Sequence, residues 1–149
     1  SNLDLGGSVA SGASGEGPGL KRRLIGVDAT FRYRPLRRAI YRRLLARTEL
    51  VWSRMEEQDH QHDTFGMYAS ADYQFARRWF TGVRYDRSEE ADEPRGFDQG
   101  YSLTFTYRPS EFSQIRGQYR RTEPAVGEAR NEVLFQLLFS IGAHGAHVF

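Results

Sequence analysis

The stretch "GYSLTFTYRPSEFSQIRGQYRR", residues 100–121, alternates apolar and polar side chains on both sides of a very short hinge. The apolar positions are Tyr101, Leu103, Phe105 and Tyr107 before the hinge, and Ile115, Gly117 and Tyr119 after it. A period of two predicts β-strands with two unlike faces. The stretch therefore predicts an antiparallel hairpin, and it raises the question of which face meets water.

The same alternation recurs along the whole chain and predicts eight strands. They are expected at about residues 3–11, 24–34, 39–53, 65–75, 79–87, 101–108, 114–120 and 132–141. The connections after the second, fourth and sixth strands are short, whereas those after the first, third, fifth and seventh are long and polar. An up-and-down meander would place the two kinds at opposite ends, as outer-membrane barrels do.

Length and composition limit the classes of protein that fit. A chain of 149 residues suits one domain, residues 1–149, and an aromatic content of 13% argues against disorder. No apolar run approaches the roughly 18 residues of a membrane helix, but a barrel strand needs only about 9–11 alternating residues. The absence of cysteine excludes disulfides, and a net charge of +2 is too small to indicate nucleic acid.

Tyr and Trp side chains gather near both ends of the apolar face, with mainly smaller or aliphatic residues between them. This distribution is typical of the two membrane–water interfaces, whereas a soluble core would place its largest rings centrally. The expected aromatic girdle comprises Tyr33, Trp52, Tyr73, Trp79, Tyr85, Tyr101, Tyr107 and Tyr119. We therefore expect the apolar face to meet lipid, and a soluble antiparallel β-domain with a binding role is the alternative.

The opposite face carries charges of both signs at mid-strand. We expect these side chains to form a ladder of ion pairs that fills or lines a lumen, since a ligand-binding soluble barrel would need an apolar interior. The expected ladder comprises Asp28, Arg32, Arg47, Glu49, Asp72, Arg84, Asp86, Arg116 and Arg120. The predicted fold class is an all-β, antiparallel up-and-down transmembrane β-barrel, with eight strands that either close or form the last eight strands of a larger barrel.

Three stretches carry a resemblance to a known group: "RPSEFSQIRGQYRR", "FQLLFSI" and the terminal "GAHGAHVF". They resemble the C-terminal end of Gram-negative outer-membrane β-barrel proteins, and more narrowly barrels related to porins and TonB-dependent receptors. Phe149 resembles the terminal aromatic residue by which the barrel assembly machinery recognises a last strand. The departure is that His147, Gly145 and Ala143 occupy positions where that signal has aromatic or aliphatic residues. The Ser-Asn start leaves open whether the chain is a whole barrel or the C-terminal fragment of one.

Several loop residues could bind ligands. Asp59, His60, His62 and Asp63 could hold a divalent cation, although a solvated acidic loop explains them equally simply. A second acidic loop carries Glu89, Glu90, Asp92 and Glu93, which could bridge lipopolysaccharide through divalent ions. Arginines at the short-turn end could contact anionic lipid headgroups or simply form a solvated rim; they are Arg37, Arg38, Arg42 and Arg43.

No nucleophile with a paired base, nucleotide loop or zinc-protease motif is visible, so we do not expect an enzyme or a resident cofactor. The expected function is porin-like passage of small polar solutes in the bacterial outer membrane. A plugged barrel that acts as a membrane anchor or scaffold through its acidic external loops is the alternative. The expected partners are outer-membrane lipid, lipopolysaccharide and the barrel assembly machinery, which would bind the C-terminal strand.

Overall fold

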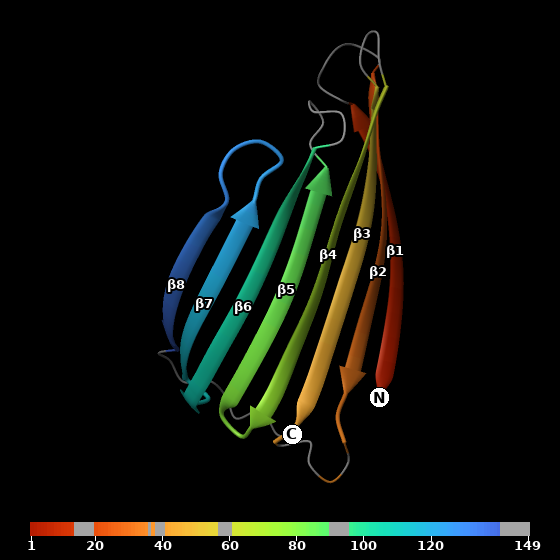
Figure 1. Cartoon of the computed structure of the whole chain (residues 1–149). Helices are drawn as coiled ribbons and strands as arrows, with labels where there is room; N and C mark the ends of the chain where they lie inside the picture. Colours follow the sequence, from red (N-terminus) through yellow and green to blue (C-terminus); the bar gives the residue numbers. More distant parts are fainter. Residues whose placement is uncertain (14–19, 36, 38–40, 57–60, 90–95, 141–149) are drawn as a thin grey trace.

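Eight β-strands form one antiparallel sheet in chain order (Figure 1). The computed structural model describes residues 1–13, 20–35, 37, 41–56, 61–89 and 96–140. The strands are β1 (Asn2–Ala13), β2 (Lys21–Tyr33), β3 (Arg43–Glu56), β4 (Gln61–Ala76), β5 (Trp79–Glu89), β6 (Phe97–Ser110), β7 (Ser113–Glu123) and β8 (Arg130–Phe139). The predicted all-β, up-and-down arrangement of eight strands is confirmed.

The two ends of the sheet carry different connections. We call the end that joins β1 to β2, β3 to β4, β5 to β6 and β7 to β8 the loop end, which lies at the top of Figure 1. The opposite end, which carries the other three connections, is the turn end. Two of its connections are tight: residues 77–78 join β4 to β5, and residues 111–112 join β6 to β7. In the second turn, the Phe112 amide donates to Ser110 Oγ at 3.2 Å.

The predicted strict alternation of short and long connections is wrong. Residues 34–42 join β2 to β3, whereas only residues 57–60 join β3 to β4. The connection between β3 and β4 is shorter than expected because both strands extend further toward the loop end than the hydrophobic pattern indicated. Arg54 and Asp63, which the pattern placed in a loop, are directly paired across these strands. Their side chains form two hydrogen bonds, from Nε to Oδ1 at 2.8 Å and from Nη2 to Oδ2 at 2.9 Å.

The sheet is curved but open, so a barrel closed by these eight strands alone is not the observed structure. Within the described part of the chain, each strand contacts only its sequence neighbours, and β1 makes no contact with β8. The diameter of a barrel grows with its number of strands. An arc of eight strands that does not bring its edges together therefore has too little curvature for an eight-stranded barrel.

The described residues form a single layer without an apolar core. Among the described residues, no hydrophobic side chain is buried, and the buried polar ones are Gln74 and Thr106, at 4% and 3% exposure. Leu103 is 51% exposed and Phe135 is 82% exposed. The described residues also contain no helix long and apolar enough to span a bilayer. The described part of the chain therefore leaves the apolar side of the sheet exposed.

Candidate functional site

The strand register separates two faces of unlike chemistry. One face, the apolar face, includes Val27, Leu50, Met67, Val83, Leu103, Tyr119 and Val133 on successive strands β2 to β8. The other face, the polar face, includes Thr30, Arg47, Ser70, Arg84, Ser102, Arg120 and Glu132, which follow one another in direct register. Arg32 on β2 and Arg116 on β7 line the same cavity, which shows that the polar face is the concave one.

Ion pairs connect several of the charged residues expected on the polar face. Arg84 binds Asp86 on the same strand, with Nη2 2.6 Å from Oδ1 and Nε within 2.9 Å of both carboxylate oxygens. Arg47 lies 4.0 Å from the carboxylate of Asp72 on β4. Arg84 also places its guanidinium carbon 4.1 Å from the centroid of the Tyr68 ring. Four members of the predicted ladder therefore form two ion pairs with one another.

Two acidic partners were missed by the sequence pattern. Asp4 on β1 pairs with Arg32, and Glu132 on β8 pairs with Arg120, whose Nη2 lies 2.7 Å from Oε2. Each acid has the parity of the polar face, which could have identified it. Asp4 was missed because β1 is rich in glycine, and Glu132 because it stands at the beginning of its segment.

The remaining members of the expected ladder have no ion pair among the described residues. Asp28 lies directly opposite Glu49 in the register of β2 and β3, so two like charges are neighbours there. Arg116 donates from Nε to the hydroxyl of Thr106 at 3.1 Å. The paired side chains of the ladder are 40–51% exposed, so each pair contributes only about 0–1 kcal/mol to stability.

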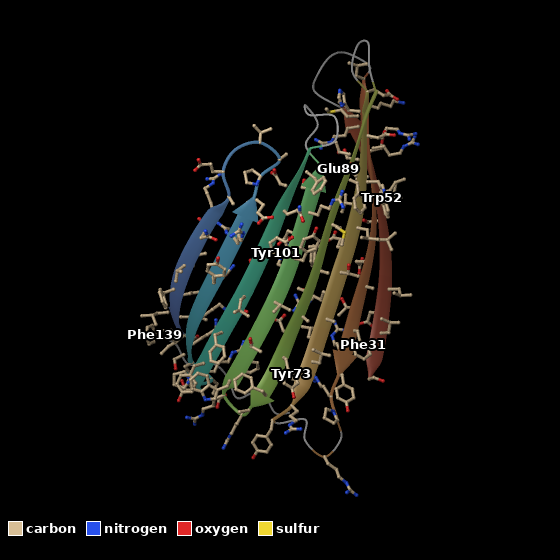
Figure 2. The ribbon with its side chains drawn as sticks, in the orientation of Figure 1. Phe31, Trp52, Tyr73, Glu89, Tyr101 and Phe139 are labelled. Atoms are coloured by element: carbon tan, nitrogen blue, oxygen red, sulfur yellow. The ribbon has the colours of Figure 1, made fainter. Side chains whose placement is uncertain are left out.

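The eight aromatic residues expected to form a girdle all have the parity of the apolar face. At the turn end, Trp79 stacks on Tyr107 with ring centroids 4.4 Å apart. Toward the loop end, Tyr85 and Tyr101 contact at 5.3 Å, and Trp52 contacts Phe65 at 5.4 Å. Figure 2 shows Trp52 and Tyr101 nearer the loop end, and Phe31 and Tyr73 nearer the turn end. The structure thus places aromatic rings toward both ends of one exposed apolar surface.

Charged pairs lie toward the loop end of this face, level with the aromatic rings or beyond them. Arg54 pairs with Asp63, and Arg121 pairs with Glu123, with Nε 2.7 Å from Oε1. The hydrogen bonds from Arg54 hold the pKa of the exposed Asp63 carboxyl below its usual value. Tyr119 donates its hydroxyl to Asn131 Oδ1 at 2.7 Å. The apolar surface therefore ends at a polar border on this side.

The expected cation site is not assembled by the described residues. His62 and Asp63 are consecutive in β4, so their side chains lie on opposite faces of the sheet, and Asp63 is bound by Arg54. Asp59 and His60 lie outside the described residues. Of the second acidic loop, Glu89 is described: its carboxylate accepts a hydrogen bond from the Phe65 amide at 2.9 Å. Within the described ranges, no three acidic or histidine side chains are close enough together to hold a metal.

Some residues of the other expected sites are not among the described residues. Arg38 and residues 141–149, which include the terminal sequence that resembles an assembly signal, are not among the described residues. Arg43, expected at a lipid headgroup, instead has its guanidinium carbon 5.4 Å from the centroid of the Phe80 ring on the polar face. It therefore belongs to the concave side of the sheet.

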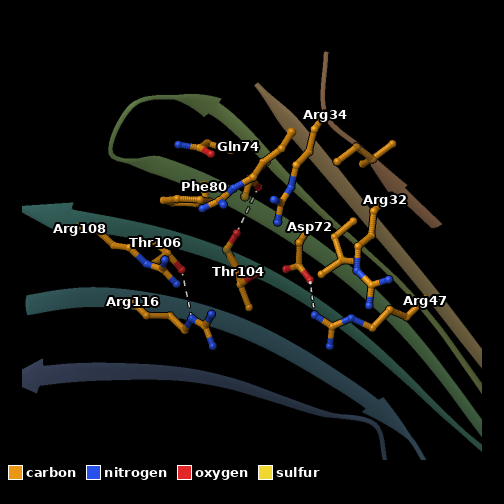
Figure 3. Close-up of a pocket in the computed structure, with 14 residues that line it drawn as sticks. Arg32, Arg34, Arg47, Asp72, Gln74, Phe80, Thr104, Thr106, Arg108 and Arg116 are labelled. Atoms are coloured by element: carbon orange, nitrogen blue, oxygen red, sulfur yellow. Dashed lines mark hydrogen bonds and ion pairs between the residues drawn. The ribbon is translucent and has the colours of Figure 1, made fainter. Parts of the chain in front are cut away.

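The concave face carries cavities at both ends, and two of them have contrasting charge. The first, at the turn end, has a volume of about 260 Å³ and is lined by residues from six strands (Figure 3). The second, toward the loop end, has a volume of about 650 Å³. Its charged lining residues are Glu49, Arg84, Asp86, Arg87, Asp98 and Arg120, three of each sign. The first cavity is dominated by arginine, so the concave face changes from strongly basic to balanced along its length.

Comparison with known proteins assigns no activity. No family model matches the chain, and no solved structure matches it. An uncharacterized protein from Aquifex aeolicus is 34% identical over 97 residues, which covers 56% of this chain and 20% of that protein. The chain thus spans about one fifth of the length of the curated relative it matches.

Proposed function

We propose that this chain forms part of the wall of a bacterial outer-membrane β-barrel that passes small polar solutes. Its apolar face would contact lipid, and its polar face would line the aqueous lumen. The observation that carries the proposal is the inverted polarity of the sheet: the convex face of the described strands is mainly apolar and exposed, whereas the concave face carries the mid-strand ion pairs. Lumen-facing and lipid-facing residues alternate in this way along the strands of transmembrane barrels.

The positions of the aromatic rings support this proposal. Trp52 and Phe65 are eight residues from Leu44 and Tyr73 along β3 and β4, which corresponds to about 26 Å of extended strand. The apolar band of a transmembrane barrel is about 25 Å tall along the membrane normal, and tilted strands need a somewhat longer stretch to cross it. The aromatic rings and the polar border at the loop end are consistent with membrane interfaces.

The open edges of the sheet bear on the size of the proposed barrel. A strand edge in lipid leaves unpaired amide and carbonyl groups, each of which costs several kcal/mol. β1 and β8 would therefore need hydrogen-bond partners in a bilayer. We propose that strands additional to the eight described here pair with these edges and complete a wider barrel.

The depth of the two tryptophans tests the orientation toward lipid. Trp52 and Trp79 are the only tryptophans in the sequence, and they lie toward opposite ends of the apolar face. In vesicles containing brominated lipids, the variants Trp52→Phe and Trp79→Phe each leave one emitter. We expect both variants to be quenched most strongly by bromine near the headgroups, with blue-shifted emission. An unquenched, monodisperse protein without detergent would overturn the proposal and favour a soluble β-domain.

Conductance separates passage of solutes from an anchoring role. Reconstitution in planar bilayers should give stepwise, ion-carrying openings if the lumen is open. A protein that inserts and shows lipid quenching but carries no current would be the plugged anchor or scaffold barrel instead. The two measurements therefore separate the membrane location from the transport activity.

A further inference from the structure

The cavity at the turn end of the concave face gathers an unusual excess of positive charge. Its charged lining residues are Arg32, Arg34, Arg43, Arg47, Arg108, Arg116 and Asp72. Six arginines and one aspartate thus line a cavity of about 260 Å³. Like charges at this density repel one another, so the arrangement favours binding of anions.

Neutral hydrogen-bond acceptors orient two of these arginines. Arg108 donates from Nε to Gln114 Oε1 at 3.2 Å, and Arg116 donates from Nε to Thr106 Oγ1 at 3.1 Å. Both bonds use the nitrogen at the base of the guanidinium fork. Across the described residues, no hydrogen bond or ion pair is seen for the terminal nitrogens of Arg108 or Arg116, which can therefore donate to a ligand.

The ring of Phe80 makes cation–π contacts with two of the cavity arginines. The guanidinium carbons of Arg43 and Arg108 lie 5.4 Å and 4.7 Å from the centroid of Phe80. A cation near a ring face at these distances is attracted by the quadrupole of the ring. Phe80 therefore keeps two positive side chains close together without neutralising either, which a carboxylate would do.

Acidic neighbours are scarce at this end. Arg32 is paired with Asp4, and Arg47 lies at the limit of an ion pair with Asp72, at 4.0 Å. Within the part of the chain that the structure describes, the other four cavity arginines have no carboxylate within 4.0 Å. At the balanced cavity, by contrast, Arg84 and Arg120 are each bound to an acid at 2.6–2.7 Å. Among the described residues, four of the six arginines at the turn-end cavity therefore have no ion pair, against one of three, Arg87, at the balanced cavity.

We propose that the turn-end cavity is a binding site for small soluble solutes that carry phosphoryl groups with two or more negative charges. This proposal rests on the proposed function, in that it names the class of solute the lumen selects. The planar fork of arginine binds phosphate oxygens through two parallel hydrogen bonds. Four arginines without acidic partners match a multiply charged ligand better than a single carboxylate. The phosphoryl group could also come from a lipid headgroup, so the test includes both sources.

Calorimetric titration of the detergent-solubilised protein with inorganic pyrophosphate tests the site directly. The variant carries Arg108→Gln and Arg116→Gln together, and the matched control is Arg121→Gln. Arg121 lies on the same strand as Arg116 but on the apolar face, where it pairs with Glu123. We expect saturable binding to the native protein, at least about tenfold weaker binding to the double variant, and nearly unchanged binding to the control.

Short-chain phosphatidylglycerol, below its critical micelle concentration, provides the second arm of the titration. Saturable binding of pyrophosphate with weaker binding of the lipid supports the proposal. Binding of the lipid alone, no saturable binding, or equal loss in the double variant and the control would overturn it. Circular dichroism of each variant checks that the strands remain folded, and Arg116→Lys, which keeps the charge but loses the fork, should bind with intermediate affinity.

The outcome is distinguishable from failure of the proposed function. Pyrophosphate binding in detergent requires neither an open lumen nor current. Conductance without pyrophosphate binding would leave the barrel proposal intact and remove the site. Pyrophosphate binding by a protein that does not insert into lipid would support the binding site and overturn the barrel proposal.

Discussion

Trp79 stacks on Tyr107 across the β5–β6 strand pair, with ring centroids 4.4 Å apart and ring planes inclined by 28°. The two residues are direct partners in the strand register, and Trp79 also contacts Phe105 at 5.6 Å. No turn joins β5 to β6 at this end of the sheet, so the stacked rings help to hold the two strands together there.

This stacking should be measurable as a coupling energy. Trp79→Leu and Tyr107→Leu, alone and combined, form a double-mutant cycle, and we expect the pair to be coupled by about 0.5–1.5 kcal/mol. The measurement is urea unfolding in detergent micelles. Trp52→Leu combined with Tyr107→Leu is the control, and it should be additive because Trp52 lies on β3 toward the other end. A coupling of zero for the stacked pair would contradict the structure.

Gly82 should not tolerate a side chain. A Cβ at this position would lie 2.6 Å from Asp72 Oδ1 and 2.7 Å from Thr104 Oγ1, both on short side chains with little freedom to move away. We expect Gly82→Ala to lower the free energy of unfolding by about 1–3 kcal/mol. Gly66→Ala is the matched control on the neighbouring strand, because its nearest contact would be the Arg87 carbonyl at 3.8 Å. Equal effects of both variants on denaturant unfolding would refute this explanation.

The open edges of the sheet can be tested by spin labelling, since the chain has no cysteine of its own. Val9 on β1 and Val133 on β8 are exposed on the apolar face, at 74% and 65%. We expect labels at Val9→Cys and Val133→Cys to be much further apart than labels at Val9→Cys and Ile25→Cys, which are register partners. Adjacent strands lie only about 5 Å apart.

The spin-label distances should be measured in detergent, with each labelled protein diluted in unlabelled protein. Dilution removes distances between different copies. A distance between the labels on β1 and β8 as short as in the control pair would show that these eight strands close on themselves.

The stabilisation that the Arg54–Asp63 pair contributes at the loop end should be lost at acidic pH. Hydrogen bonds from Arg54 lower the pKa of Asp63. A lowered pKa in the folded state means that the stabilisation is present above the pKa of the unfolded chain and is lost as pH falls through the folded pKa. Arg54→Gln should raise the pKa of Asp63 toward its ordinary value, as followed by NMR of the carboxyl carbon. Arg121→Gln should leave that titration unchanged, and an unshifted Asp63 in the native protein would contradict the pairing.

The sequence alone determined the strands and their two faces, because side-chain direction in a strand follows from parity, which is a local property. Phe105 and Thr106 are adjacent in the sequence, yet the structure leaves Phe105 50% exposed on one face and Thr106 3% exposed on the other. The alternation predicted these opposite directions. The alternation could not predict how far β3 and β4 extend. Their added length includes the Arg54–Asp63 pair, which forms only when the two strands lie side by side.

Only the tertiary structure decided which charges meet and whether the sheet closes. Asp4 reaches Arg32, and Glu132 reaches Arg120, because of register between strands, which the periodicity of one strand does not contain. The turn-end cavity requires still more, because Arg32 and Arg116 come from β2 and β7 and share it only through the curvature of the sheet. Curvature is a property of all eight strands together, and it leaves β1 and β8 apart while bringing six arginines to one place.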